Sequence, residues 1–406
     1  MALRLFNTLT RTTEEFTSSK IVNLYVCGVT PYDTTHLGHA RTYVVFDVLV
    51  RQLMNHRLHV NYVQNITDVD DSILQRASEL GEAYNELGDH YTSRYFEDVA
   101  ALGLIPASVY PKATESIAEM QEMIARLLER GHAYIVDGDV YFDISTWPAY
   151  GRLSRLERGE MLEIESAEDS STVNDPHKRD PLDFLLWRSN SPGEPSWDSP
   201  WGSGRPGWHL ECSTIAMKHL GRQLDIHGGG DDLVFPHHEC EIAQSEAVTG
   251  VEPFARFWVH VAMARLGGEK MSKSEGNMLF VRDLLEHHSP DACRIYLLGT
   301  HYRGPLDYNE ELLQRAGEFA LTLATAARLP IAEDGGRTVE AEDHTRRFDD
   351  ALDDDLDTPA ALGVMAELAE LVTDGFAEGY SIRNARRTLR SFASRLGLQL
   401  EVKPSR

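Results

Sequence analysis

Two short motifs, far apart in the sequence, carry side chains that could bind a nucleoside triphosphate. The first is HLGH, His36 to His39, and the second is KMSKS, Lys270 to Ser274. Imidazoles can donate hydrogen bonds to phosphate oxygens, and lysines beside serine hydroxyls supply mobile positive charge. Taken singly, each motif has a structural explanation, as histidines that cap a helix or as a solvated basic loop. Together and in this order, the motifs indicate that the chain activates a carboxylate with ATP.

The residues around HLGH predict a strand, a loop and a helix in succession. An apolar run, Asn23 to Val26, precedes a loop of turn residues from Cys27 to Thr35, and a largely buried helix begins at Leu37. HLGH therefore lies at a helix N-terminus, where unpaired N–H groups and the helix dipole favour anions. Gly38 lets a ligand approach the backbone closely. Glycines on both sides of KMSKS are typical of a loop that closes over phosphates.

Four residues elsewhere have the chemistry of metal ligands. Cys27 ends the first strand, Cys212 follows the stretch GWHLE, and His237 and Glu241 are four residues apart on a predicted helix. Residues at that spacing share one helix face. Two thiolates, an imidazole and a carboxylate suit Zn²⁺. No CxxC spacing announces the site, so buried structural thiols remain the alternative at this point.

The motifs and the segments between them resemble the cysteinyl-tRNA synthetases, a family of class I aminoacyl-tRNA synthetases. The resemblance runs from about Leu5 to about Arg395 and is carried by YVCGVTPYDTTHLGHA, YVQNITDVDD, GEPSWDSPWGSGRPGWHLECS, DIHGGGDDLVFPHHECEIAQSEA and GGEKMSKSEGN. It implies an α/β fold, with a Rossmann-like parallel sheet, an α+β insertion and a C-terminal helical bundle. It also implies an enzyme that forms cysteinyl-adenylate from L-cysteine and ATP with Mg²⁺, and transfers the cysteinyl group to tRNA(Cys), which it contacts through the acceptor stem.

The resemblance assigns roles to individual residues. The expected catalytic residues are His36, His39, Lys270 and Lys273. The expected ATP-binding residues are His36, Gly38, His39, Gly229, Asp231 and Lys273. The expected amino-acid pocket consists of Gly28, Thr30, Thr67, Trp208 and His227. Core packing for Trp208, a helix cap for Thr67 and an ordinary turn for the run Gly228 to Asp232 are the alternatives.

The resemblance also implies one zinc ion per chain, held by Cys27, Cys212, His237 and Glu241. Zinc can take the substrate thiolate as an added ligand, whereas a serine hydroxyl is a poor one, so selection of cysteine over serine rests on a bond.

Two neighbours of these ligands complicate the expected zinc set. Cys240 lies one residue before Glu241, and we expect it to pack behind the ligands or in the core. His238 could compete with His237.

Length and composition bound the organisation of the chain. The 406 residues predict five segments: 1–103, the first half of the catalytic domain; 104–195, an insertion; 196–257, the second half with the zinc site; 258–309, a connecting subdomain with KMSKS; and 310–406, a helical bundle. The formal net charge of −25 argues against broad, sequence-independent binding of nucleic acids. No apolar run could span a bilayer and no signal peptide is present, so we expect a cytoplasmic protein. In a reducing cytosol its four cysteines are not expected to form disulfides. We also expect a monomer.

Three local expectations concern polar stretches. The stretch 163–179 is polar and turn-rich, and we expect a loop there. A helix is expected to begin near Pro359 with Thr358 as its cap. The acidic run from Asp353 to Asp357 is expected to be a solvated face.

The early end of the chain leaves the final acceptor open. Synthetases of this family continue into a small anticodon-reading domain, so we expect a short form that lacks it. A sister family, which joins cysteine to the amine of glucosaminyl-inositol in mycothiol biosynthesis, ends at a similar length and is the alternative. His227, where the sister family has Gln, favours the synthetase. A non-catalytic paralogue is a third alternative, which the intact motifs disfavour.

Overall fold

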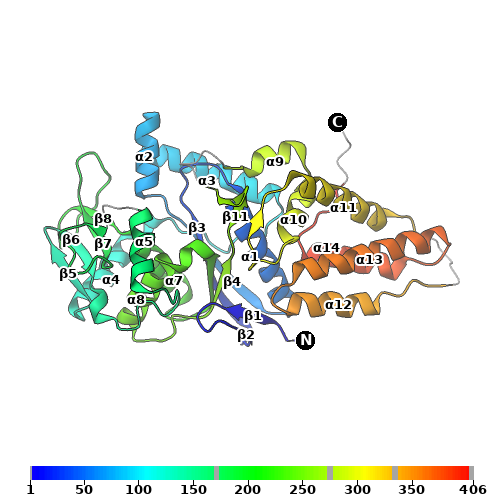
Figure 1. Ribbon diagram of the computed structural model, residues 1–406, viewed down its shortest axis with the longest axis horizontal. Helices are drawn as coiled ribbons and strands as arrows, with labels where there is room; N and C mark the ends of the chain where they lie inside the picture. The colour runs from blue at the N-terminus through cyan, green and yellow to red at the C-terminus, as the bar shows by residue number, and fades with distance from the viewer. Residues whose placement is uncertain (1, 169–172, 272–277, 332–336, 402–406) are drawn as a thin grey trace.

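The computed structural model describes residues 2–168, 173–271, 278–331 and 337–401. Its centre is a four-stranded parallel sheet in the order β10-β9-β3-β4 (Figure 1). The strands are β3 (Ile21–Val29), β4 (His59–Ile66), β9 (Leu224–Gly230) and β10 (Ala255–Val261). Parallel strands need crossovers and covered faces, which explains their apolar composition. The expected α/β class is confirmed.

Helices cover both faces of this sheet, and side-chain alternation along β3 decides what each face meets. Leu24 and Val26 pack with helix α1 (Leu37–Asn55), whereas Tyr25 and Cys27 point to the other face. There they meet α7 (Trp208–Leu220) and α8 (His237–Thr249). The pleat of one strand thus turns Cys27 toward the two helices that carry Cys212, His237 and Glu241.

Apart from α7 and α3 (Tyr84–Ala101), which pack on the central sheet and its helices, the segment between β4 and β9 forms a second unit beside the sheet, at the left of Figure 1. It contains an antiparallel sheet in the order β5-β6-β7-β8. The elements of the segment before α7 are α2 (Asp71–Leu80), α3, η1 (Ala113–Ser116), α4 (Ile117–Glu129), β5 (Ala133–Val136), β6 (Asp139–Phe142), η2 (Ile144–Thr146), α5 (Arg158–Glu168), β7 (Phe184–Ser189) and β8 (Gly204–Pro206). The expected loop at 163–179 is wrong in its first part, because α5 continues to Glu168.

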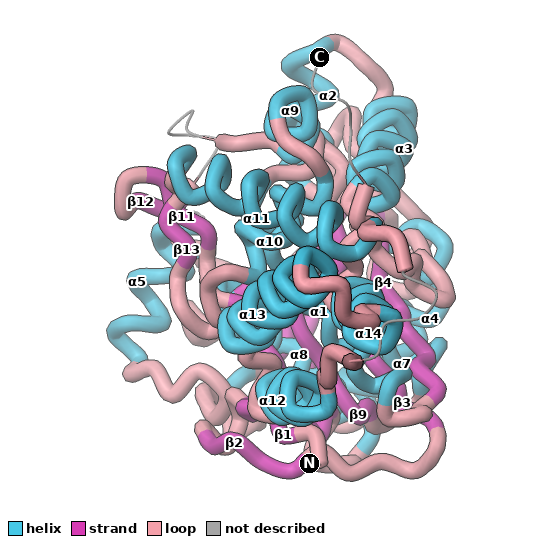
Figure 2. Tube along the Cα trace, turned by 90° about the vertical axis from the view of Figure 1, so that its right-hand side faces the viewer, coloured by secondary structure: helices cyan, strands magenta, loops and turns pink. Residues whose placement is uncertain are grey.

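The C-terminal part is helical and lies on the opposite side of the central sheet, as Figures 1 and 2 show. A small sheet, β12-β11-β13, connects it to the centre. The elements are β11 (Ala264–Leu266), β12 (Glu269–Lys270), α9 (Val281–His287), α10 (Pro290–Leu298), β13 (Leu306–Asp307), α11 (Glu310–Arg328), α12 (Glu342–Asp353), α13 (Thr358–Ala377) and α14 (Arg383–Arg395). The short helix η3 (Asp231–Val234) belongs to the centre, between β9 and α8. The N-terminal hairpin pairs β1 (Arg4–Asn7) with β2 (Thr12–Glu15).

Two expectations for this region are wrong. Asp357, and not Thr358, caps α13, accepting a hydrogen bond from the Ala360 amide at 3.0 Å. The Thr358 hydroxyl instead donates to a backbone carbonyl of α10. The acidic run is not a solvated face throughout: Asp353 and Asp355 are buried. Each accepts hydrogen bonds from other segments, as buried carboxylates must.

Candidate active site and metal centre

HLGH lies at the carboxyl end of β3, where the chain enters α1. His36 is the N-cap of the helix, and its Nδ1 accepts a hydrogen bond from the His39 amide at 3.3 Å. The two imidazole rings stack with their centroids 3.7 Å apart. A Cβ at Gly38 would come within 2.9 Å of the His36 ring, so only glycine leaves room for this arrangement. The motif thus presents two imidazoles and a helix N-terminus in one place.

A cavity of about 360 Å³ opens beside this helix N-terminus. Residues from β3, α1, β4, α7 and the η3 turn line it, together with the chain on either side of 272–277. The lining includes Cys27, Gly28, Thr30, Tyr32, His36, Gly38, His39, Thr42, Asn65, Thr67, Trp208, Cys212, Gly230, Asp232, His237, Met263, Met271 and Met278. Both motif histidines and three of the four expected metal ligands therefore face the same space.

The four expected ligands converge on the face of β3 that α7 and α8 cover. The Sγ atoms of Cys27 and Cys212 are 3.7 Å apart, and Cys27 Sγ is 3.8 Å from Glu241 Oε1. His237 Nε2 is 3.2 Å from the same carboxylate oxygen. Ligands at ordinary zinc bond lengths around a tetrahedral ion would be about 3.8, 3.6 and 3.4 Å apart for these three pairs. The donor set therefore fits Zn²⁺ in both chemistry and spacing.

A second set of donors overlaps the first. Cys27, His227, His238 and Glu241 also place one ligand atom each within 4.8 Å of one another. His227 Nε2 is 3.0 Å from Glu241 Oε2, and His238 Nε2 is 3.2 Å from Cys27 Sγ. Cys240 belongs to neither set. It lies in a separate apolar cluster, where its thiol is 3.3 Å from the Tyr150 hydroxyl.

Burial controls the protonation of this cluster. It raises the pKa of the Cys27 thiol well above its ordinary value, and the neighbouring Cys212 and Glu241 raise that pKa further. Burial also raises the pKa of the Glu241 carboxyl and lowers the pKa of the His237 imidazole well below 6.5. Each group is thus driven toward its neutral form. A dication would reverse this preference for the Cys27 thiol and the Glu241 carboxyl, because it stabilises their anions.

Aromatic stacking and hydrogen bonds fix the ligand side chains from behind. The indole of Trp208 stacks on the His237 ring with a centroid distance of 4.2 Å. His237 Nδ1 lies 3.0 Å from His209 Nδ1. His238 Nδ1 is 2.7 Å from His260 Nε2, whose other nitrogen is 2.7 Å from a threonine hydroxyl near the N-terminus. These contacts restrict the rotation of each imidazole about its χ angles.

The structure places most, but not all, of the residues predicted for substrate binding at the cavity. Gly28, Thr30, Thr67 and Trp208 line it, whereas His227 is fully buried behind it and contacts Glu241. In the turn after β9, Gly230 and Asp232 line the cavity in place of the expected Gly229 and Asp231. The Lys270 side chain and Lys273 lie outside the described residues; the Lys270 backbone belongs to β12.

Several residues at the cavity were not predicted from the sequence. Asn65 Oδ1 accepts the Gly28 amide at 2.8 Å, and Asn65 Nδ2 donates to the Thr67 hydroxyl at 3.0 Å. Asn65 therefore ties β3 to the start of the segment after β4. Its position two residues before Thr67, in the stretch YVQNITDVDD, was the signal available. Met271 and Met278 complete the wall and flank the KMSKS residues that are not described.

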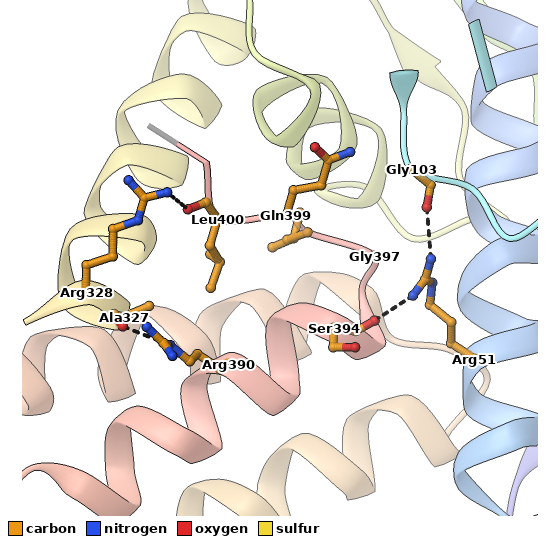
Figure 3. Close-up of a pocket in the computed structure, with 10 residues that line it drawn as sticks. Arg51, Gly103, Ala327, Arg328, Arg390, Ser394, Gly397, Gln399 and Leu400 are labelled. Atoms are coloured by element: carbon orange, nitrogen blue, oxygen red, sulfur yellow. Dashed lines mark hydrogen bonds between the residues drawn. The ribbon is translucent and has the colours of Figure 1, made fainter. Parts of the chain in front are cut away.

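A second cavity, of about 480 Å³, lies away from this site between α1, α11 and α14 (Figure 3). Three arginines line it, Arg51, Arg328 and Arg390, and each donates to a backbone carbonyl. Among the described helices, none has the length and apolar composition needed to cross a membrane.

Comparison with known proteins agrees with this geometry. The family of class I (C) tRNA synthetase catalytic domains matches residues 13–318, and the DALR domain matches residues 347–401. The expectation of a short form without its C-terminal domain is therefore corrected, because the C-terminal helices correspond to a DALR domain.

Curated relatives match nearly the whole chain. A cysteine–tRNA ligase of Methylococcus capsulatus is 46% identical over 98% of this chain and 85% of its own length. One from Legionella pneumophila strain Paris is 48% identical over 91% of this chain and 80% of its own.

Solved structures show the fold alone. Mycobacterium tuberculosis methionyl-tRNA synthetase in complex with methionyl-adenylate has a TM-score of 0.65 at 16% identity, covering 93% of this chain and 88% of that one. With the family match over most of the chain and relatives of this identity, the chain belongs to the cysteine–tRNA ligases, within the class I aminoacyl-tRNA synthetases.

Proposed function

We propose that the protein activates L-cysteine with ATP to form cysteinyl-adenylate and then transfers the cysteinyl group to tRNA(Cys). One observation carries this proposal: the thiols of Cys27 and Cys212 and the imidazole of His237 face the same cavity as His36 and His39. A site for a substrate thiol and a site for phosphates are thus within one small space, as a reaction between cysteine and ATP requires.

The residues of the phosphate side act mainly by position and charge. His36 and His39, at the N-terminus of α1, bind the triphosphate, and the helix dipole stabilises the negative charge as pyrophosphate leaves. Lys270 and Lys273 are proposed to contact the leaving pyrophosphate, and Mg²⁺ arrives with ATP. Gly229 and Asp231 are proposed to lie against the adenosine, beside Gly230 and Asp232, which line the cavity.

The residues of the thiol side determine specificity. Cys27, Cys212, His237 and Glu241 are proposed to hold one Zn²⁺ ion, which would supply a Lewis acid for a sulfur ligand. Trp208 fixes the plane of the His237 ring by stacking on it. Gly28, Thr30 and Thr67 line the rest of the amino-acid pocket, and Asn65 fixes the position of Thr67.

The tRNA is proposed to contact the C-terminal helices as well as the active site. Helix α14 contains five arginines and no carboxylate, although the whole chain has a formal net charge of −25. Arg386 shows the local excess of positive charge: burial lowers its pKa, and the guanidinium groups of Arg390 and Arg383 lower it further. Arg387 and Arg390 are exposed on this helix. Phosphodiester groups are the complementary partner for such a surface.

The decisive test is ATP–pyrophosphate exchange with cysteine, serine and alanine supplied in turn. Cysteine must stimulate exchange far more strongly than serine, because only its thiol is a good zinc ligand. Equal stimulation by serine would contradict the proposed specificity.

The acceptor is tested by supplying labelled cysteine and ATP with tRNA(Cys) or with glucosaminyl-inositol. We expect label in the tRNA. Label in the amino sugar alone would identify the sister activity instead. Charge reversal at Arg387 and Arg390 should raise the KM for tRNA at least several-fold and leave pyrophosphate exchange unchanged, because no residue of α14 lines the cavity.

A further inference from the structure

Arg41 is a fully buried arginine in the first turns of α1, two residues beyond His39. Its guanidinium donates to four backbone carbonyls: Nη1 to Ala262 at 2.8 Å and to Met263 at 3.3 Å, and Nη2 to His301 at 3.2 Å and to Gly304 at 2.5 Å. Burying a guanidinium costs free energy unless its N–H donors form hydrogen bonds. The four hydrogen bonds therefore fix both the Arg41 guanidinium and the four carbonyl groups in place.

The carbonyls that Arg41 binds belong to the chain that leads into the KMSKS motif. Ala262 and Met263 follow β10 and immediately precede β11, and both line the active-site cavity. β11 pairs with β12 through Arg265 and Lys270, so the backbone of Lys270 is one strand away from the segment that Arg41 fixes. On its other edge β11 pairs with β13, which follows His301 and Gly304.

The other end of the motif is also attached to the HLGH region. The Leu37 amide donates to the Leu279 carbonyl at 2.8 Å, and the Val281 amide donates to the Thr35 carbonyl at 2.9 Å. Arg282 adds a side-chain contact here, with its Nε donating to the Thr34 hydroxyl at 3.1 Å.

An acidic residue of α3 completes this second attachment. Arg282 Nη2 lies 3.2 Å from Asp98 Oδ1, and the Thr34 hydroxyl donates to Asp98 Oδ2 at 3.2 Å. Asp98 is buried, whereas the Arg282 side chain is 33% exposed. The second attachment is therefore a closed set of three polar groups, of which Thr34 lies two residues before the HLGH motif.

We propose that Arg41 and Arg282 are positioning residues for adenylate formation, which hold the two ends of the KMSKS segment at a fixed distance from the HLGH helix. The inference rests on the proposed function, since it assumes that both motifs act on the same ATP. Neither arginine is among the residues that line the cavity. Each acts through the backbone or side chains that it binds, and its effect should therefore be on the rate of the chemical step.

The charge of Arg41 is consistent with this role. Burial lowers its pKa to about 10, and the nearby carboxylate of Asp231 opposes that shift. The guanidinium therefore remains protonated at pH 7 and keeps all the N–H groups that donate hydrogen bonds to the four carbonyls.

The test compares Arg41→Lys with Arg294→Lys in pyrophosphate exchange. Arg294 in α10 is a matched control, because it is also fully buried and donates to the carbonyls of Leu102 and Leu396, but, unlike Ala262 and Met263, neither of these residues lines the cavity. Lysine keeps the charge and loses the forked geometry. We expect both variants to unfold at lower temperature than the wild type. Only Arg41→Lys should lower kcat for exchange, by about 10- to 100-fold, with the KM for cysteine changed less than about threefold.

Arg282→Met gives a second measurement that does not depend on the folding of a core variant. Arg282 is partly exposed, so Arg282→Met opens no cavity in the core, although losing the contact with the buried Asp98 should lower the melting temperature. The variant should lower kcat with the KM for cysteine unchanged. If Arg41→Lys does not fold, the result with Arg282→Met decides. A kcat within threefold of the wild type in whichever of these variants folds would overturn the proposal.

The wild-type protein separates this proposal from the proposed function. If the wild type shows no cysteine-dependent exchange, the proposed function fails, and the positioning role fails with it. If the wild type exchanges normally and Arg41→Lys is indistinguishable from Arg294→Lys, only the positioning role is refuted.

Discussion

Removing one donor at a time distinguishes the two overlapping ligand sets around Cys27 and Glu241. The first set adds Cys212 and His237, and the second adds His227 and His238. The first offers two thiolates, and its two cysteine sulfurs are 3.7 Å apart, close to the spacing of about 3.8 Å that tetrahedral zinc requires. We therefore expect the first set to bind zinc and His227 to act on the metal only through Glu241.

The expected magnitudes follow from these contacts. Cys212→Ala and His237→Ala each remove a direct ligand and should lower zinc affinity by more than about 100-fold, equivalent to more than about 2.7 kcal/mol. His227→Ala removes no ligand of the first set, but it removes the 3.0 Å contact that orients the Glu241 carboxylate. Loss of such an orienting partner costs about 10- to 100-fold in affinity.

Competitive titration with a chromophoric chelator at fixed pH measures each affinity, and elemental analysis gives the zinc content. Cys240→Ala is the control, because this thiol is buried one residue from Glu241 but contacts Tyr150 and belongs to neither set. Its affinity should stay within about threefold of the wild type. If the His227 or His238 variant loses zinc while the Cys212 variant keeps it, the second set holds the ion and the reasoning from sulfur spacing is refuted.

Three further predictions follow. Burial lowers the pKa of His260 to about 3, so protonation favours the unfolded chain, and the His260 contribution to stability falls as the pH drops below 6.5. In urea unfolding, the free energy of unfolding of His260→Asn should therefore fall less between pH 7 and pH 5 than that of the wild type, by up to about 2 kcal/mol. The exposed control His59→Asn should match the wild type. An equal loss of stability in His260→Asn and the wild type would contradict this prediction. A Cβ at Gly28 would lie 1.7 Å from a carbonyl oxygen of β4. Gly28→Ala should therefore abolish cysteine activation and destabilise the fold by at least about 1–3 kcal/mol. The control Gly159→Ala, with open space around the added Cβ, should match the wild type in exchange and melting assays. Chelation of zinc should lower the melting temperature of the wild type, and a melting temperature unaffected by chelator would argue against a structural contribution from the metal.

Much of the site could be predicted from the sequence because its parts are local. HLGH needs only a strand, a turn and a helix start, and these follow from composition and periodicity within one stretch. The spacing of His237 and Glu241 on one helix is likewise a local property, and their side chains do lie together at 3.2 Å. Resemblance to a family added the partners that no spacing rule connects, such as Cys27 and Cys212.

The sequence leaves open those choices between neighbouring residues that depend on backbone direction. Gly230, the last residue of β9, and Asp232 in η3 line the cavity, whereas a Cβ at Gly229 would meet the side chains of Leu233 and His238. His227, two residues before Gly229, is directed at the metal ligands. In an extended strand that leads into a tight turn, a shift of one residue reverses the direction of the side chain, and composition contains no signal for it.

The sequence by itself determined the chemistry: which groups can bind phosphate, which can ligate zinc, and the alternation that directs Cys27 to one face of the sheet. The tertiary structure alone decided which distant groups meet. It brought Cys212 within 3.7 Å of Cys27, buried Asp353 and Asp355 within a run that looked solvated, and placed the Arg41 guanidinium against four carbonyls from two later segments. The physical reason is that side-chain type and local periodicity are properties of neighbouring residues, whereas burial and long-range contacts depend on how whole elements pack.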